Sequence, residues 1–517
     1  MSTGPRPSAA TAEPPPPHAW VELERDWSGT RVTVMGLGLF GGGAAVARAF
    51  ARRGAEVTIT DRRDADTLAP ALAELEGTPG LRFVLGEHRL DDFAEASLVV
   101  ANPAVPPTSE PLAVAHAAGV PITSEAALFL ASCKAPVLAV TGTQGKSSVC
   151  NMLGQLLEAC GRRVHLGGNI GRPLVDRVQE IGADELVVLE LSSYQLEVLP
   201  PQESWPHADR PVRVACVTNV LEDHLERHKT RERYRAAKRR LLELCAEDAT
   251  LIVPGDDPAL GTDSWSPEHL RRLEVHPNAS ADAHTDAETG DGASGLAIAT
   301  TDGTSFFRLN REELGRVDDL PLPGDFQRTN LLFALGAARA MNVPAKDLAQ
   351  AIAALTGLPH RLEDLGRVRG HRVWDNAVST TPDSTTGVLD SVRPGFTLLA
   401  GGQAKDLSLA ELAAAAARTA RRAITFGADG ERLAEAFEAA GLHADYAGAL
   451  ETAVERAFDV LGPGEELLFS PAAASFDAYA NFRARAMAFR AVLDRLRGDG
   501  EPVRRDRTGA SAARPLG

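Results

Sequence analysis

The sequence predicts an α/β protein of three domains, in each of which helices cover a largely parallel sheet. The first observation is an alternation of short apolar runs with Ala/Leu-rich helical stretches, which is typical of parallel sheets. The second is the length of 517 residues, which corresponds to roughly three domains at about 150 residues each. The third is composition: 44% hydrophobic and 24% charged residues are ordinary for globular domains and exclude collagen-like, coiled-coil and wholly disordered chains.

The apolar runs fall into three series. In the first, the predicted strands are Arg31–Met35, Glu56–Thr60 and Leu98–Ala101. In the second, they include Pro136–Val140, Glu185–Glu190 and Arg213–Asn219. In the third, they include Arg372–Asp375, Thr397–Ala400, Ala423–Phe426 and Glu466–Phe469. Breaks near residues 132 and 357 therefore predict domains at 30–132, 133–357 and 358–497.

Three segments have a low-complexity composition. Residues 1–29 begin with a stretch rich in Pro, Ala and Ser, and residues 498–517 are rich in Arg, Gly and Ala. Residues 278–295 are acidic and rich in small side chains. Such segments cannot bury enough apolar surface to offset the entropy of ordering. We expect two disordered tails and a mobile surface insertion at 278–295.

Charge and cysteine content exclude several classes of protein. The 54 Lys and Arg against 70 Asp and Glu give a net charge of -16, so we expect no nucleic-acid partner and no anionic-membrane partner. The five cysteines lack C-x-x-C spacing, which disfavours a disulfide framework or a zinc cluster. No apolar run reaches the roughly 18 residues that span a membrane, and no signal peptide is evident. A cytoplasmic protein is the expectation.

The first glycine-rich loop, Gly36–Gly41, directly follows the strand Val32–Met35 and precedes a predicted helix, Ala44–Arg52. Asp61 ends the next strand, twenty residues beyond Gly41. This pattern lets a pyrophosphate approach a helix N-terminus. The loop alone is compatible with an NAD-type cofactor, with another nucleotide diphosphate, or with a purely structural turn.

The second glycine-rich loop, Thr141–Ser148, follows the apolar run Leu138–Val140 and resembles a P-loop. In such a loop backbone N–H groups surround an anion, Lys146 offsets phosphate charge, and Ser147 can ligate Mg²⁺. Val140 stands where the strict pattern has its first glycine. Together the two loops favour an enzyme that joins a nucleotide-linked substrate to something else with ATP.

Acidic and histidine side chains follow the strands of the second series. Glu190 ends one strand, and Asp223 and His224 come shortly after another. Ligands bind at the carboxyl ends of parallel strands, and Mg²⁺ prefers oxygen ligands beside phosphates. His224 and His228 do not form H-E-x-x-H, so a zinc protease is disfavoured. Lys238, taken alone, is typical of a helix surface.

Eight segments resemble the Mur ligases, and specifically the members that add D-glutamate. In order they are TGTQGKS from Thr141, GGNIGRP from Gly167, ELSSYQLE from Glu190, NVLEDHLERH from Asn219, YRAAK from Tyr234, GLPHRLE from Gly357, GGQAK from Gly401 and SPAAASFDAYANF from Ser470. They occur in family order, and the resemblance covers about residues 30–495.

The resemblance implies a Rossmann-like N-terminal domain, a P-loop ATPase-like central domain and a Rossmann-like C-terminal domain. It implies that ATP phosphorylates the carboxylate of UDP-N-acetylmuramoyl-L-alanine and that the amine of D-glutamate attacks the acyl phosphate. This is a step of peptidoglycan precursor synthesis in the cytoplasm. The first loop would then bind UDP rather than NAD, and the protein would act as a monomer.

The resemblance also assigns residues to sites. ATP would be bound by Gly142, Thr143, Gln144, Gly145, Lys146, Ser147, Ser148, Gln327, Asn330 and Arg361. Two Mg²⁺ ions would be held by Ser147, Glu190, His224 and a carbamylated Lys238. The UDP substrate would contact Gly38, Leu39, Phe40, Asp61, Arg62, Asn169, Ser192 and Gln195, and the amino acid would contact Thr380, Lys405, Ser475 and Phe482. Lys146, His224 and Lys238 would be the catalytic residues.

Several positions depart from the family pattern. Gln144 replaces an Asn, Phe326-Gln327 replaces His-Asn, Val378 replaces a Lys, and Arg483 replaces a Glu. The changes at Val378 and Arg483 leave open a ligase that adds L-glutamate or another amino acid. An NAD-dependent oxidoreductase and a catalytically inactive nucleotide-binding scaffold are the remaining alternatives.

Overall fold

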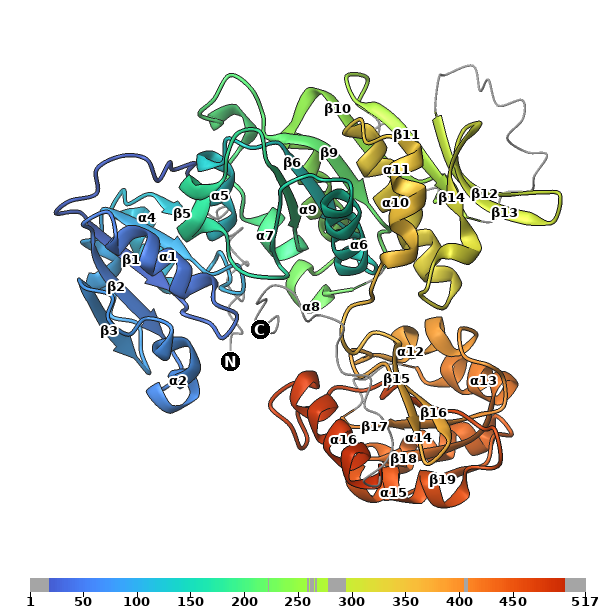
Figure 1. Cartoon of the computed structure of the whole chain (residues 1–517). Coiled ribbons are helices and arrows are strands. Elements are labelled where there is room, and N and C mark those ends of the chain that lie inside the picture. The colour runs from blue at the N-terminus through green and yellow to red at the C-terminus, as the bar shows by residue number, and fades with distance from the viewer. Residues whose placement is uncertain are drawn as a thin grey trace, which may run out of the picture.

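The computed structural model describes residues 18–221, 223–257, 260, 265, 267–277, 294–403 and 408–497. The chain forms three α/β lobes, coloured blue, green to yellow, and orange to red along the sequence (Figure 1). Each lobe contains one sheet. The predicted fold class is confirmed. In the part of the chain that the structure describes, no helix is both long and apolar enough to cross a bilayer.

The N-terminal lobe has a parallel five-stranded sheet in the order β3-β2-β1-β4-β5. Its strands are β1 (Arg31–Met35), β2 (Glu56–Asp61), β3 (Leu81–Leu85), β4 (Leu98–Ala101) and β5 (Ile122–Thr123). Its helices are α1 (Gly42–Ala51), α2 (Ala65–Ala73), α3 (Asp91–Ala94), α4 (Glu110–Ala117) and α5 (Glu125–Ser132). The strand order reverses at β1, so the loop Gly36–Gly41 lies at the switch point where such sheets bind ligands.

Residues 18–29, predicted as part of a disordered tail, are packed against the N-terminal lobe. Leu23 and Trp27 are fully buried, and the Leu23 N–H donates to Ser132 Oγ at 2.9 Å. The Trp27 ring meets Phe50 edge to face, with centroids 4.7 Å apart. The tail prediction was wrong here because its Pro-rich composition ends before these two large apolar side chains, whose burial offsets the entropy of ordering.

We expect Trp27→Ala to lower the free energy of unfolding of the N-terminal lobe by about 3–5 kcal/mol, because it leaves a large cavity against Phe50. Urea unfolding followed by circular dichroism measures this loss. Phe83→Ala, on β3, is the matched control, since its side chain is 42% exposed. Equal losses for the two variants would contradict the anchoring role of Trp27.

The central lobe has a nine-stranded sheet in the order β14-β13-β12-β11-β10-β9-β6-β8-β7. Its strands are β6 (Val137–Thr141), β7 (Val164–Gly168), β8 (Leu186–Glu190), β9 (Val212–Val217), β10 (Cys245–Pro254), β11 (Arg271–His276), β12 (Ser294–Thr301), β13 (Thr304–Leu309) and β14 (Glu312–Arg316). The pairs β12·β13 and β13·β14 are antiparallel, and the others are parallel. Of the mobile insertion predicted at 278–295, residues 278–293 lie outside the described residues. The prediction was wrong for 294 and 295, because both belong to β12.

Helices α6 and α10 pack on one face of the central sheet and bury a second hydrophobic core (Figure 1). The α-helices of this lobe are α6 (Lys146–Ala159), α7 (Ser193–Glu197), α8 (Leu225–His228), α9 (Arg231–Arg239), α10 (Asp325–Ala340) and α11 (Ala345–Ala351). Short 3-10 turns are η1 (Val175–Glu180), η2 (Gln202–Ser204), η3 (Arg240–Leu244), η5 (Val317–Asp319) and η6 (Ile352–Ala354).

The C-terminal lobe has a six-stranded sheet in the order β15-β16-β20-β17-β18-β19, in which only β15 is antiparallel to its neighbour. Its strands are β15 (Glu363–Val368), β16 (His371–Asp375), β17 (Phe396–Gly401), β18 (Ala420–Phe426), β19 (Ala444–Tyr446) and β20 (Leu467–Phe469). Its helices are α12 (Pro382–Leu389), α13 (Ala410–Thr419), α14 (Gly430–Ala439), α15 (Leu450–Val460) and α16 (Phe482–Leu496). The three sheets lie within the predicted ranges 30–132, 133–357 and 358–497.

Polar contacts join the lobes. Arg48 on α1 forms an ion pair with Asp176 on η1 at 2.9 Å. The segment leading to the C-terminal lobe is held against α6, because Asn151 Nδ2 and Gln155 Nε2 each donate to the carbonyl of Thr356 at 2.9 Å. The first residues of the third lobe are therefore held close to the P-loop helix.

Candidate active site

Three neighbouring strands of the central sheet deliver the predicted site residues to one edge. The strand β6 lies between β9 and β8, and Val140 pairs with both Glu190 and Cys216. The P-loop, Glu190 and the segment leading to His224 therefore leave the sheet side by side. Adjacent parallel strands end at the same edge, which is why these side chains, far apart in sequence, can converge.

The glycines of the P-loop are required by their surroundings. Gly145 has a φ of 83° and directly precedes α6. A Cβ at Gly142 would lie 1.9 Å from Thr218 Oγ1, and one at Gly145 would lie 2.5 Å from Asn330 Oδ1. The loop thus turns tightly into α6, whose first N–H groups lack intrahelical acceptors and can bind an anion.

Asn219 fixes the shape of the P-loop. Its Oδ1 accepts hydrogen bonds from the N–H groups of Thr143 and Gln144, at 3.1 and 2.9 Å. Its Nδ2 donates to the Gln144 carbonyl at 3.2 Å. The Gln144 side chain itself is exposed, so the change from the family's Asn leaves the loop backbone in place.

Lys146 lies at the start of α6 beside charges of both signs. Its Nζ donates to the Thr143 carbonyl at 2.8 Å. Burial lowers the pKa of Lys146, the charge of Arg361 adds to this, and Glu190 and Asp223 oppose it. Burial also lowers the pKa of Arg361, and Glu190 opposes it. The structure therefore brings Arg361, from the start of the third lobe, to the same site as Lys146 and Glu190.

Glu190 presents an unpaired oxygen to this site. The residue is 1% exposed, and its Oε1 accepts a hydrogen bond from Asn169 Nδ2 at 2.9 Å. Its Oε2 has no hydrogen-bond partner among the described residues. Burial of a carboxylate oxygen without a hydrogen-bond donor costs free energy, unless a cation or another ligand binds that oxygen. The donor type fits Mg²⁺, which takes carboxylate oxygens.

Lys238 is buried rather than on a helix surface. It is 1% exposed, and its Nζ donates to the Gly142 carbonyl at 2.7 Å. Burial lowers the pKa of Lys238 to about 6, the charge of Lys146 adds to the effect, and Asp223 and Glu190 oppose it. At neutral pH the amine is therefore largely uncharged, and an uncharged amine is a nucleophile.

His224 occupies a constrained but accessible position. Its φ is 53°, and its ring meets Tyr194 edge to face at 5.1 Å between centroids. Its Nε2 lies 3.5 Å from Asp223 Oδ2, and its Nδ1 lies 3.4 Å from Glu226 Oε1. The imidazole is partly exposed, so a ligand can reach it.

Tyr234 contacts the P-loop, Lys238 and His228, although no role was predicted for it from the sequence. Its hydroxyl lies 2.9 Å from Thr143 Oγ1, and the Lys238 Nζ lies 4.5 Å from its ring centroid. His228 packs on the same ring, with centroids 5.3 Å apart. The sequence could have indicated this contact, because a tyrosine four residues before a lysine lies on the same face of a helix.

Two amides of α10 are buried, and one of them, Asn330, lies beside Gly145 of the P-loop. Gln327 and Asn330 are 2% and 7% exposed, and they share a helix face because they are three residues apart. Gln327 Oε1 has no partner within the described part of the chain. This acceptor is suited to a donor such as an adenine amino group, and the ATP-binding role of Gln327 stays a prediction.

Five of the predicted UDP residues, Gly38, Leu39, Phe40, Asp61 and Arg62, lie at the switch point of the first sheet. Asp61 accepts hydrogen bonds from the Gly38 N–H at 3.3 Å and from the Arg63 side chain at 2.8 Å. Burial would raise the pKa of Asp61, but these bonds outweigh it and hold the pKa below its usual value. Leu39 and Phe40 are 45% and 80% exposed, an open apolar surface of the kind on which a base can stack. Arg62 is also exposed.

Ser192 and Gln195 have a local structural role. Ser192 Oγ accepts from the Gln195 N–H, and Gln195 Oε1 accepts from the Ser192 N–H, which forms a capping box at α7. Their contact with a UDP substrate stays a prediction. The cap holds the chain that directly follows Glu190, so both residues support the position of that carboxylate.

The predicted amino-acid residues follow neighbouring strands of the C-terminal sheet. Thr380 follows β16, Ser475 follows β20, and Phe482 begins α16. Ser475 is buried. Lys405 lies outside the described residues. Because β16 and β20 are adjacent, Thr380 and Ser475 emerge at one edge of the sheet.

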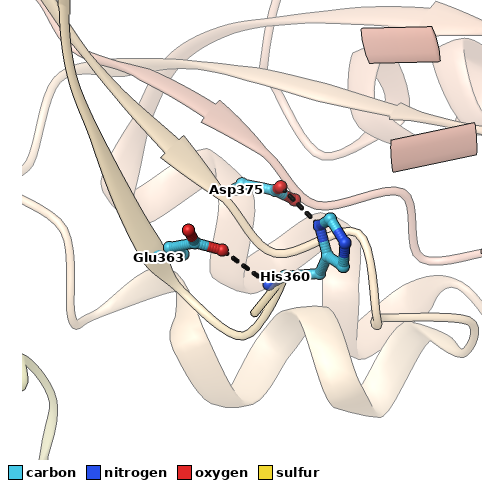
Figure 2. A group of neighbouring side chains, drawn as sticks. All are labelled: His360, Glu363 and Asp375. Carbon is cyan, nitrogen blue, oxygen red and sulfur yellow. Dashed lines mark hydrogen bonds and ion pairs between the residues drawn. The ribbon is translucent and has the colours of Figure 1, made fainter. Parts of the chain in front are cut away.

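His360, Glu363 and Asp375 form a second polar cluster at the start of the C-terminal lobe (Figure 2). His360 Nδ1 lies 2.7 Å from Asp375 Oδ2, and the His360 N–H donates to Glu363 Oε2 at 2.8 Å. Arg490 donates from Nε and Nη2 to Asp375 Oδ2 at 2.9 and 2.7 Å. The guanidinium already supplies the cation for these carboxylates, so the cluster is an ion-pair network next to Arg361 rather than a metal site.

Comparisons with known proteins agree with this architecture. Residues 140–338 match the family model of the Mur ligase middle domain, and residues 30–124 match that of the MurD-like N-terminal domain. The UDP-N-acetylmuramoylalanine--D-glutamate ligase of Roseiflexus sp. is 35% identical over 478 residues, which cover 90% of this chain and 99% of the relative. The enzyme of that name from Geobacter metallireducens is 35% identical, and the match covers 92% of this chain and 99% of the relative.

Solved structures show the same fold at lower identity. The UDP-N-acetylmuramate-alanine ligase MurC from Thermotoga maritima has a TM-score of 0.57 at 18% identity, over 90% of this chain and 99% of that one. The MurF ligase of Thermotoga maritima in complex with ADP has a TM-score of 0.51 at 18% identity, over 88% and 92%. This chain is an α/β ligase with a P-loop. It belongs to the Mur ligase family, and the two relatives above are both named for the addition of D-glutamate.

Proposed function

We propose that this protein is the ATP-dependent ligase that adds D-glutamate to UDP-N-acetylmuramoyl-L-alanine in peptidoglycan precursor synthesis. One observation carries the proposal most strongly. The P-loop Lys146, the unpaired carboxylate oxygen of Glu190 and the buried amine of Lys238 meet at one edge of the central sheet. An oxidoreductase needs none of these groups, and family membership argues against the NAD alternative for Gly36–Gly41.

The reaction has two steps. The substrate carboxylate attacks the γ-phosphorus of ATP, and the bond to the β-bridging oxygen breaks to release ADP. The amine of D-glutamate then attacks the acyl carbon, phosphate leaves, and the nitrogen loses a proton. The N-terminus of α6 and Lys146 bind the phosphates, and Arg361 adds positive charge from the third lobe. These fixed charges offset the repulsion between two anionic substrates.

The residues present fit two Mg²⁺ ions. Glu190 Oε2 is buried and unpaired. We infer that Glu190, Ser147, His224 and Lys238 would together hold the two ions once the Lys238 amine has become a carbamate. Bound Mg²⁺ would neutralise phosphate charge and orient the transferred group. Asn169 and the α7 cap hold the Glu190 side chain in position.

The environment of Lys238 favours carbamylation. The uncharged nitrogen attacks the carbon of CO₂, a proton leaves, and the product carries two oxygen atoms and one negative charge. A pKa of about 6 keeps most of the amine uncharged at pH 7, whereas an ordinary lysine with a pKa near 10.4 is almost fully protonated there. The carbamate would convert this uncharged amine beside Lys146 into an anionic metal ligand.

We expect Lys238→Ala to lower ADP release by about 10²-fold or more, because one metal ligand is lost, and we expect added bicarbonate not to restore it. Carbon-13 NMR after equilibration with labelled bicarbonate should show a carbamate signal that the variant lacks. In the wild type this signal should decrease below pH 6, where the amine becomes protonated and cannot attack CO₂. Lys346→Ala, at an exposed position of α11, is the control. Wild-type rates in Lys238→Ala would refute the carbamate.

The amino acid is tested directly by an ADP-release assay with UDP-N-acetylmuramoyl-L-alanine and a panel of amino acids. We expect release with D-glutamate and little with L-glutamate. Val378 and Arg483, where the family has other residues, are the reason to include both enantiomers. Release with L-glutamate alone would overturn the D-glutamate assignment, and absence of release with every amino acid would overturn the proposed function.

A further inference from the structure

One buried guanidinium in the C-terminal lobe ties three loops together. Arg485, on α16, is fully buried. Its Nη1 donates to the carbonyls of Gly401, Ala473 and Ala474 at 3.1, 2.9 and 3.1 Å. Its Nη2 donates to the carbonyl of Ala377 at 3.4 Å. The Gly401 carbonyl ends β17, and the other three carbonyls belong to the segments that follow β20 and β16.

Those segments carry the residues predicted to bind the incoming amino acid. Ser475 is directly bonded to Ala474, and Thr380 lies three residues after Ala377. Phe482 is the first residue of α16, one helical turn before Arg485. Because β16, β20 and β17 are neighbours in the sheet, the loops at their carboxyl ends lie next to one another. The buried Arg485 side chain donates hydrogen bonds to all three.

The guanidinium of Arg485 is tightly packed against the neighbouring backbone. A Cβ at Gly402 would lie 2.8 Å from Arg485 Nη1 and 2.2 Å from the Ala474 carbonyl oxygen. The loops after β17 and β20 are also bonded to each other, because the Gln403 N–H donates to the Ala474 carbonyl and the Ala474 N–H donates to the Gln403 carbonyl, each at 2.9 Å. The backbone at Gly402 therefore packs directly against the Arg485 guanidinium and against the loop after β20.

Burial of a charged group is costly unless its hydrogen bonds offset the desolvation. Burial lowers the pKa of Arg485 to about 10, while the charges of Asp477 and Tyr479 oppose the shift. The guanidinium thus stays charged at neutral pH. An apolar side chain of similar size would avoid the desolvation but would leave the carbonyls of three loops without a common donor.

We propose that Arg485 is the positioning residue of the amino-acid site, holding the loops of Thr380 and Ser475 and the start of α16 in one geometry. The inference rests on the proposed function. It concerns the second step only, because the contacts of Arg485 are all within the C-terminal lobe, whereas the acyl phosphate forms at the central sheet.

The test compares Arg485→Met and Arg485→Lys with the wild type. The KM for D-glutamate is measured by ADP release, and formation of the acyl phosphate is measured separately by trapping with hydroxylamine. In that trap the hydroxylamine nitrogen attacks the acyl carbon and displaces phosphate, so no glutamate is needed. Arg495→Met is the matched control, since Arg495 lies on the same helix with its side chain 60% exposed.

We expect Arg485→Met to raise the KM for D-glutamate by at least about tenfold while hydroxamate formation stays within about twofold of wild type. Arg485→Lys should give a smaller increase, because an ammonium keeps the charge but cannot span three loops as a planar fork does. If thermal unfolding shows that Arg485→Met does not fold, the KM of Arg485→Lys for D-glutamate tests the positioning role instead.

An unchanged KM for D-glutamate in both variants would overturn the positioning role. An equal loss of hydroxamate formation and of ligation would also overturn it, because it would indicate a general structural role. A wild-type protein that releases no ADP with any amino acid would instead overturn the proposed function, which the wild-type assay reveals before any variant is compared.

Discussion

Lys146→Ala is expected to lower kcat/KM for ATP by about 10³-fold, which is the scale of removing a preorganised charge from a phosphoryl-transfer site. Lys146 is the first residue of α6, and its Nζ is held by the Thr143 carbonyl at 2.8 Å. The ammonium therefore lies at the mouth of the P-loop before ATP arrives. ADP release under steady-state conditions measures the loss.

The same substitution should also change Lys238. The charge of Lys146 is one cause of the low pKa of Lys238, so its removal raises that pKa and leaves less uncharged amine at neutral pH. The carbon-13 carbamate signal should decrease in Lys146→Ala and persist in Lys146→Arg, which keeps the charge. An undiminished signal in the alanine variant would contradict this electrostatic coupling.

Lys134→Ala is the control for Lys146→Ala. The Lys134 side chain is 67% exposed and forms an ion pair with Glu24 at 3.0 Å, away from the P-loop. Exposed pairs of this kind contribute about 0–1 kcal/mol, so this variant should keep wild-type turnover. Turnover of Lys146→Ala at the rate of the control would exclude the proposed phosphate contact. Wild-type turnover that is lost in Lys146→Ala would instead eliminate the catalytically inactive scaffold.

Glu190→Gln is expected to lower kcat by about 10²-fold or more, because it replaces a carboxylate oxygen with an amide that binds Mg²⁺ poorly. The substitution is close to isosteric, and the amide oxygen can still accept the hydrogen bond from Asn169. Any loss therefore reports on the unpaired Oε2 rather than on packing. ADP release measured against MgCl₂ concentration should show a higher Mg²⁺ requirement.

A readout independent of turnover supports the interpretation of Glu190→Gln. Mn²⁺ binding in the presence of ADP, followed by electron paramagnetic resonance, should weaken in Glu190→Gln and not in Glu158→Gln, which alters an exposed residue of α6. Thermal unfolding should show that Glu190→Gln remains folded, since it removes a buried charge. Wild-type Mn²⁺ binding in this variant would rule out Glu190 as a metal ligand.

Local patterns were sufficient to predict much of the site. Gly142, Gly145 and Lys146 lie within one short motif, and a strand that ends in Glu190 has a clear apolar pattern. Because parallel strands end at one edge, these short motifs predict their own proximity. The roles predicted for Gln327 and Asn330 followed from the family resemblance; the structure buries both amides and places Asn330 beside Gly145.

Other features depend on contacts between distant parts of the chain. The pattern around Lys238 resembles an exposed helix face, yet Tyr234 and the Gly142 carbonyl enclose its amine. Arg485 looks like one more basic residue of an Arg-rich helix, and only the folded C-terminal lobe shows the loops that it joins. Leu23 and Trp27 were hidden beside a Pro-rich tail and became visible only through their burial.

The amino-acid sequence by itself determined the α/β class, the three-part organisation and the chemistry of the phosphate loop, because each is written in a short contiguous pattern. Only the tertiary structure determined which ionisable side chains are buried away from water. Burial depends on neighbours that come from remote segments of the chain. It lowers the pKa of Lys238, and it encloses both the unpaired Oε2 of Glu190 and the guanidinium of Arg485.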